Sequence, residues 1–158
     1  MTQTVVLGIG NVLLTDDGAG VHAVRQLESL SSARPDVAVV DGGTLSFTLA
    51  PLIAAAQRLI VIDAAQLQAP PGTVRAFFNE EFDAFLGCAK LTVHEVSLVD
   101  LLDIAKLTEG LPAQRVLLAV QPEAVEWGDV PSPAVQRALP QIHSRVMELL
   151  DAWPARPS

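Results

Sequence analysis

The chain has 158 residues, of which 50% are hydrophobic, and carries a formal net charge of −8 at neutral pH. This length fits one domain that buries roughly 70% of the surface exposed by its unfolded chain. The acidic balance argues against nucleic acid or an anionic membrane as a partner, because both attract clustered Lys and Arg. No apolar run approaches the roughly 20 residues of a membrane helix, and no signal-peptide pattern is present, so we expect a cytoplasmic monomer.

Apolar β-branched runs alternate along the chain with segments of helical spacing. The pattern predicts strands at 5–9, 36–41, 58–63, 73–78 and 115–120. Between and after them it predicts helices at 20–30, 44–57, 80–86, 92–105 and 132–153. The last of these helices is expected to be broken or kinked near Pro140. This alternation predicts a doubly wound α/β sheet with right-handed crossovers. We assign residues 1–153 to a single domain and expect 154–158 to be a frayed tail.

Acidic residues follow three of the predicted strands. The first strand leads to Asp16 and Asp17, the second ends at Asp41, and the third ends at Asp63. If the spatial order begins 2-1-3, Asp17 and Asp63 face each other where the order of the strands reverses, which is where open α/β sheets bind ligands. One of the adjacent pair is expected to cap a helix, and which of the two is free stays open.

His94 is the histidine with the most informative position. It lies within the capping-box spacing of Thr92 and Glu95, which predicts the first turn of a helix. The positive end of a helix disfavours protonation there and leaves a neutral nitrogen that can bind metal. Two carboxylates and one imidazole suit zinc, nickel or manganese. His22 and His143 are expected to be structural or solvated.

Several other catalytic patterns are missing. Leu13 stands where a dinucleotide fingerprint needs its third glycine, and the chain has no phosphate loop, nucleophile elbow or His-Glu-x-x-His helix. Cys88 is the only cysteine, which excludes an internal disulfide, and no histidine adjoins it. A serine or cysteine hydrolase is therefore disfavoured, and Cys88 is expected to be structural.

One long stretch resembles a known family. The run Gly-Ile-Gly-Asn-Val-Leu-Leu-Thr-Asp-Asp-Gly-Ala-Gly at 8–20 is similar to the N-terminal signature of the hydrogenase maturation proteases. These endopeptidases process the large subunit of nickel–iron hydrogenases. The resemblance continues through residues 41–44, 59–64, 71–73, 94–95 and 120–123, and so covers nearly the whole chain.

The resemblance implies a twisted five-stranded, mostly parallel sheet with helices on both faces. It also implies that a short C-terminal peptide is cut from the large-subunit precursor after nickel insertion. The metal-binding and catalytic trio of the family falls on Asp17, Asp63 and His94. The nickel is carried by the substrate, and zinc, cadmium or manganese can occupy such a site in a crystal.

Two other functions fit the same three ligands. One is a non-catalytic, nickel-dependent chaperone that binds and releases the precursor, and the other is a metal-dependent hydrolase of another small substrate. Gly42 and Gly43 either let the substrate tail approach closely or form a plain turn between strand and helix, with equal weight.

Overall fold

The computed structural model describes residues 4–88, 98–108 and 110–153. Five strands form one sheet in the order β2-β1-β3-β5-β4, with bounds β1 Thr4–Ile9, β2 Val37–Gly43, β3 Arg58–Ala64, β4 Val74–Phe78 and β5 Gln114–Val120. The first four strands in this order pair in parallel, and β4 pairs antiparallel with β5. The predicted five-stranded, mostly parallel sheet is therefore confirmed. His94, the predicted helix start at 92–95 and the predicted tail at 154–158 lie outside the described residues.

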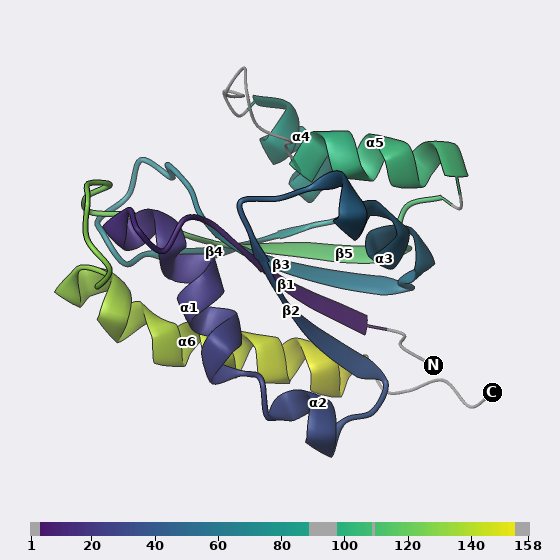
Figure 1. Ribbon diagram of the computed structural model, residues 1–158, viewed down its shortest axis with the longest axis horizontal. Helices are drawn as coiled ribbons and strands as arrows, with labels where there is room; N and C mark the ends of the chain where they lie inside the picture. The colour runs from purple at the N-terminus through teal and green to yellow at the C-terminus, as the bar shows by residue number, and fades with distance from the viewer. Residues whose placement is uncertain (1–3, 89–97, 109, 154–158) are drawn as a thin grey trace.

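Helices cover both faces of the sheet, as Figure 1 shows. One face carries α1 (Ala19–Gln26) and α6 (Pro133–Ala152), with the four-residue α2 (Leu30–Ala33) beside them. The other face carries α3 (Ala50–Ala55), α4 (Glu80–Cys88) and α5 (Leu98–Thr108). The arrangement is the three-layer α/β sandwich that the alternating sequence pattern predicts.

The two cores follow from the alternation of side chains along each strand. Val6, Ile60 and Leu118 face α1 and α6. Their neighbours in the sequence, Leu59 and Leu117 among them, face the helices on the other side. Because both faces are buried, the central strands are apolar without interruption, as is usual for parallel sheets.

Two predicted helices differ from the observed ones. The helix predicted at 20–30 ends at Gln26, and Leu30–Ala33 forms a separate short helix. The helix predicted at 44–57 begins later, with a 3-10 turn at Phe47–Leu49 followed by α3. Pro51 then falls in the first turn of α3, where its missing N–H costs no hydrogen bond.

Of the break or kink predicted at Pro140, the break is wrong, because α6 runs without interruption from Pro133 to Ala152, and a kink stays a prediction. Pro140 lies on the exposed side of this helix. The carbonyl of residue 136, which loses its helical donor, lies on the same side and is accessible to water. Ser132 caps the start of the helix by accepting a hydrogen bond from the Val135 N–H.

The chain leaves β1 through α1 toward β2, and returns from β2 through α3 to β3 on the other side of β1. The carboxyl ends of β1 and β3 are therefore the point at which the strand order reverses.

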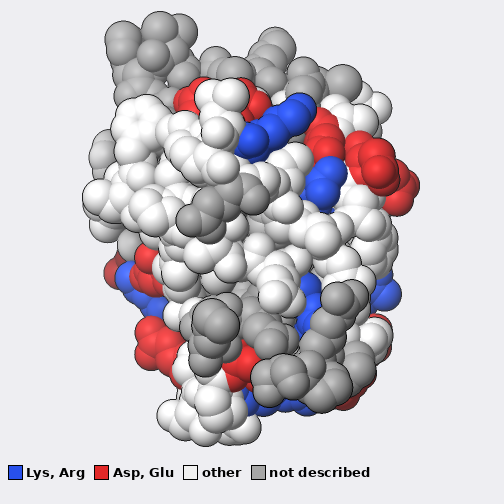
Figure 2. Space-filling view, turned by 90° about the vertical axis from the view of Figure 1, so that its right-hand side faces the viewer, with Lys and Arg blue, Asp and Glu red and all other residues white. Residues whose placement is uncertain are grey.

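Figure 2 shows the opposite end of the molecule, where blue and red side chains are interspersed on a mainly uncharged surface. In the described part of the chain, no helix has the length and apolarity that crossing a membrane requires.

Candidate active site

Asp17 and Asp63 come together at this reversal point. Asp17 lies in a 3-10 turn (Thr15–Gly18) between β1 and α1, and Asp63 is the penultimate residue of β3. Both residues are partly buried. Burial raises the pKa of Asp63 well above its usual range, and the neighbouring Asp17 carboxylate raises this pKa further. The 3-10 turn that carries Asp17 contacts β3, as the sequence predicts, while the role of the two carboxylates as ligands stays a prediction.

The chemistry of this pair suits a cation. Two carboxylates that share a partly buried site repel each other when both are charged. The hydrogen bond from the backbone N–H of Ala64 lowers the pKa of Asp63, but by less than burial and Asp17 raise it. A divalent ion between them would favour both ionised forms, since opposite charge stabilises a carboxylate. Carboxylate oxygens alone suit magnesium, calcium or manganese, and an added imidazole would favour zinc or nickel.

The loop after β1 fixes one oxygen of Asp17. Asp17 Oδ2 accepts a hydrogen bond from the Asn11 N–H at 2.9 Å, and Asn11 Oδ1 accepts one from the Leu13 N–H at 2.9 Å. Gly10 allows the loop to close, because its φ is +136° and a Cβ there would lie 1.9 Å from the Asp17 carbonyl oxygen. Asp17 Oδ1 accepts no hydrogen bond from the described residues and is available to a ligand.

Asp16 has a different task from its neighbour. Its buried carboxylate accepts hydrogen bonds from the Glu123 and Ala124 N–H groups and from both the N–H and the hydroxyl of Ser132. Burial raises the pKa of Asp16, but these hydrogen bonds, led by that of the Ser132 N–H, outweigh the effect and lower the pKa below its usual value. Asp16 thus holds the loop at 122–132, which leaves Asp17 as the candidate ligand of the two.

Asp41, the third acid at a strand end, is occupied by protein partners. Its Oδ1 accepts a hydrogen bond from the Gly43 N–H at 3.0 Å, and its Oδ2 lies 3.3 Å from Arg25 Nε. Arg25 and Asp41 line a groove of about 220 Å³ beside the ends of β1 and β2, together with Leu13, Gly43 and Thr44 among others. Asn11, whose N–H donates to Asp17, also lines this groove, so the groove lies near Asp17.

Gly42 and Gly43 differ in what surrounds them. A Cβ on Gly42 would lie 2.7 Å from a methyl group of Leu7 and 3.1 Å from the Gly8 carbonyl oxygen, so this glycine packs closely against β1. Gly43 has a φ of +49° and faces open space, since a Cβ added there would meet only Asp41 Oδ1 within 4 Å. Gly43 therefore lines the groove, and Gly42 does not.

Sequence reasoning missed the role of Gln121, which follows β5 and is buried. Gln121 Oε1 accepts from the Leu67 N–H at 2.6 Å, and its Nε2 donates to Gln66 Oε1 and to the Pro122 carbonyl. These bonds fasten the segment that follows Asp63. In the sequence, Gln121 is a lone polar residue directly after an apolar strand, which could have marked it as important. Its hydrogen-bond partners lie 54 and 55 positions away, so the sequence could not show what it binds.

The third predicted ligand, His94, lies outside the described residues. Among the residues that are described, no group of three His, Cys, Asp or Glu side chains could hold a metal ion. His22 and His143 belong to α1 and α6, and each has a buried Nε2 with no hydrogen-bond partner in the described part of the chain. Burial lowers the pKa of His22, and Arg25 lowers it further.

The fold and these residues define an α/β protein with an acidic, cation-compatible site at the point where its strand order reverses. A family model described as hydrogenase maturation protease matches residues 21–149. The chain is 36% identical over 156 residues to the hydrogenase expression/formation protein HoxM of Cupriavidus necator, covering 98% of this chain and 77% of HoxM. It is 33% identical over 149 residues to the hydrogenase 2 maturation protease of Escherichia coli, covering 94% and 90% of the two chains.

A solved structure agrees with these relatives. The hydrogenase maturating endopeptidase HybD from Escherichia coli superimposes with a TM-score of 0.78 at 31% identity, covering 93% of each chain. The protein belongs to the hydrogenase maturation protease family. The resemblance inferred from the sequence motifs is confirmed.

Proposed function

We propose that this protein is an endopeptidase that removes a short C-terminal peptide from the nickel-loaded precursor of a nickel–iron hydrogenase large subunit. Family membership supports the protease activity, and the sequence resemblance supports the choice of substrate. The nickel dependence is argued from the pair Asp17 and Asp63: burial and the Asp17 carboxylate raise the pKa of Asp63, and a divalent ion would stabilise both carboxylates in their charged form.

In this proposal the nickel arrives with the substrate. The free oxygen of Asp17 and the carboxylate of Asp63 bind the ion from the protease side, and His94 supplies the third ligand. Binding the ion fixes the position of the scissile peptide bond relative to the protease residues. The reacting groups are then held in a fixed geometry and need not meet by diffusion. When no substrate is present, the same ligands can take up another divalent ion such as zinc, cadmium or manganese.

Water is the proposed nucleophile, because the sequence offers no Ser–His or Cys–His pair. The water oxygen adds to the scissile carbonyl carbon, the peptide C–N bond breaks, and the nitrogen leaves as an amine after taking up a proton. The products are a large subunit with a new C-terminal carboxylate and a free peptide. The contribution of the protease residues is to orient the substrate and to stabilise its cation.

The groove beside β1 and β2 is the proposed path of the C-terminal peptide. It adjoins Asp17 through Asn11, and Gly43 presents backbone without a side chain at its wall. An extended chain can approach a glycine closely, and the volume of about 220 Å³ accommodates a small number of side chains. Of the two predicted substrate-binding glycines, we keep Gly43 in this role and assign Gly42 to packing.

The proposal is tested by following peptide release from purified nickel-loaded precursor by mass spectrometry. Asp17→Asn, Asp63→Asn and His94→Ala should each lose at least about 100-fold in processing rate, and double variants should lose little more, because the residues share one ion. Asp103→Asn changes an exposed aspartate on α5 and should process normally.

Three results would contradict the proposal. Normal processing by Asp63→Asn or His94→Ala would remove the shared ion from the mechanism. Binding of the nickel-loaded precursor without any peptide release would favour the chaperone, and release of product from generic peptides or esters would favour a hydrolase of another substrate.

A further inference from the structure

Four large apolar side chains are exposed on two loops near the candidate site. Among the described residues, Trp127 is 82% exposed, Val130 61%, Leu13 56% and Val125 53%. We name these four residues the apolar rim. Large exposed apolar groups on neighbouring segments are typical of protein interaction surfaces. Trp is also the residue most enriched among those that dominate binding energy at such surfaces.

The two loops that carry the apolar rim are joined by backbone hydrogen bonds. The Gly128 N–H donates to the Leu13 carbonyl at 2.9 Å, and the Thr15 N–H donates to the Gly128 carbonyl at 2.8 Å. The Thr15 hydroxyl donates to the Ala124 carbonyl at 2.8 Å. With the bonds to the Asp16 carboxylate described above, the loop at 122–132 is held at both ends and in its middle. A surface ordered in advance loses little conformational entropy when it binds.

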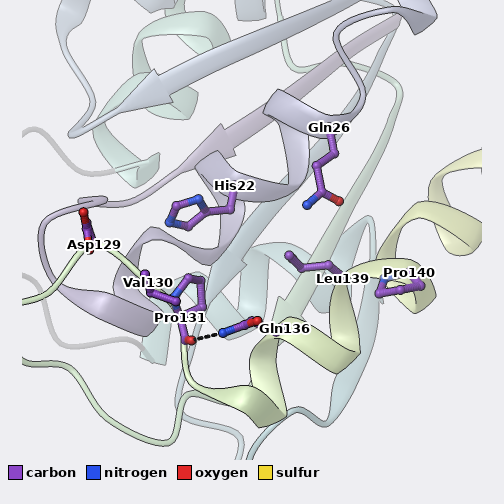
Figure 3. A pocket seen from close by; sticks show the side chains of 8 residues that line it. All are labelled: His22, Gln26, Asp129, Val130, Pro131, Gln136, Leu139 and Pro140. Atoms are coloured by element: carbon purple, nitrogen blue, oxygen red, sulfur yellow. Dashed lines mark hydrogen bonds between the residues drawn. The ribbon is translucent and has the colours of Figure 1, made fainter.

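The apolar rim lies between two hollows. Leu13 lines the groove of about 220 Å³ beside Asp17. Val130 lines a second pocket, of about 340 Å³, between α1, α6 and the 122–132 loop. Figure 3 shows this pocket, with His22 on α1 facing the loop and Gln136 on α6 hydrogen-bonded to the Pro131 carbonyl at 2.7 Å. The surface is therefore continuous from the proposed peptide path to the pocket beside α6.

The charged side chains of the loop that carries Val125, Trp127 and Val130 are of one sign. Glu123, Glu126 and Asp129 are exposed on the same loop, and residues 122–131 contain no Lys or Arg. A partner that covers this surface must desolvate a tryptophan and face three carboxylates. The complementary surface is an apolar hollow bordered by Lys or Arg.

We propose that the apolar rim docks the folded body of the hydrogenase large-subunit precursor, on a hollow of that chemistry, while the precursor's C-terminal peptide enters the groove. The identity of the partner rests on the function proposed above. The structure links the apolar rim to the candidate site. Asp16 fastens the loop that carries Trp127, and the next residue, Asp17, lies at the carboxylate site. A protein held by Trp127 is thus held at a fixed position relative to Asp17.

The first test separates docking from chemistry by steady-state kinetics on the nickel-loaded precursor. Trp127→Ala should raise KM by about tenfold or more and leave kcat within about twofold, because a hot-spot residue contributes binding energy alone. The matched control is Leu107→Ala, at an exposed apolar residue (86%) near the end of α5, which should change neither constant. An unchanged KM in Trp127→Ala would overturn the proposal.

The second test needs neither nickel nor cleavage, so it stands even if the nickel mechanism fails. The protein is labelled with 5-fluorotryptophan at Trp127 and Trp153, the resonances are assigned with Trp153→Phe, and unlabelled nickel-free precursor is added. The ¹⁹F resonance of Trp127 should shift, and the midpoint of the titration should move to higher precursor concentration as salt is raised. Glu126→Gln combined with Asp129→Asn should weaken the salt dependence.

Two outcomes of this titration would overturn the docking proposal. One is a Trp127 resonance that does not move at any precursor concentration. The other is a resonance that moves with the concentration of the protease alone, because the surface then pairs two copies of this chain.

Discussion

Asp16 and Asp17 are adjacent and chemically identical, and their surroundings give them different tasks. Four donors from the 122–132 loop converge on Asp16, whereas Asp17 receives one hydrogen bond, from Asn11. A carboxylate with several hydrogen-bond donors is stabilised in its charged form. Asp16 therefore acts through structure, whereas Asp17 Oδ1 accepts no hydrogen bond from the described residues.

Asp16→Ala should lower the free energy of unfolding by on the order of 3 kcal/mol, because it leaves buried donors without an acceptor. The wild-type carboxylate has a lowered pKa in the folded protein, so its stabilisation is present above the unfolded pKa and is lost as pH falls through the folded value. Urea unfolding at neutral and acidic pH measures both effects. An Asp16→Ala protein as stable as Asp103→Ala would contradict this role.

Asp63→Asn should gain stability near neutral pH while losing processing. The pKa of Asp63 is raised, so its ionisation disfavours the folded state. That penalty is absent below the unfolded pKa, grows as pH rises toward the folded pKa and is complete above it. In thermal unfolding with a chelator present, the variant should have a higher Tm than wild type at neutral pH and the same Tm in acid. A variant that is less stable than wild type at neutral pH would show that Asp63 is not strained.

Cys88→Ala should process precursor at close to the wild-type rate. Cys88 is the last residue of α4, and no histidine is adjacent to it in the sequence. A thiol nucleophile needs a base or a cationic neighbour to form its thiolate. Peptide release by Cys88→Ala is compared with that by wild type, and a folded variant without activity would point to a thiol mechanism.

At the scale of elements, the site depends on how closely α1 approaches the sheet. A Cβ on Gly20, the second residue of α1, would lie 2.1 Å from the Ile62 carbonyl oxygen and 2.5 Å from that of Ile9. Only glycine allows the start of α1 to contact the ends of β1 and β3 in this way. This contact holds the Asp17 turn against Asp63.

Gly20→Ala should therefore destabilise the protein by about 1–3 kcal/mol, since the added methyl group meets backbone atoms that cannot move aside cheaply. Gln26→Ala is the control, because it adds no atoms on an exposed position of the same helix. Denaturant midpoints of the two variants give the comparison. Equal midpoints would mean that α1 can shift away from the strands without cost.

For the molecule as a whole, much of the fold could be predicted from local pattern. The buried strands β1, β3 and β5 are apolar on both faces. The acids that follow the first and third strands predicted Asp17 and Asp63 at one edge of the sheet once the order 2-1-3 was assumed, and the sheet has that order. The resemblance supplied the assignment of the trio. The split of the first helix was not predicted, and the predicted alternatives of a break or a kink at Pro140 left the continuity of the last helix open, because tertiary packing and solvent exposure decide both.

What the sequence could not show is contact between distant segments. Asp16 meets Glu123 and Ser132 across 107 and 116 positions, and no local pattern marks those pairs. The exposure of Trp127 depends on the same contacts, since the loop that carries it is fixed by Asp16 and Thr15. A tryptophan in a sequence is expected to be largely buried, so its exposure is visible only in the structure.

Nickel dependence is tested most directly by a single measurement. Wild-type protein in excess is mixed with nickel-loaded and with nickel-free precursor, and the rate of C-terminal peptide release is followed for each. We predict release from the nickel-loaded form only, because Asp17 and Asp63 need the substrate's cation to position the scissile bond. Equal rates of release from the two forms would contradict a mechanism in which these carboxylates act on the nickel of the substrate.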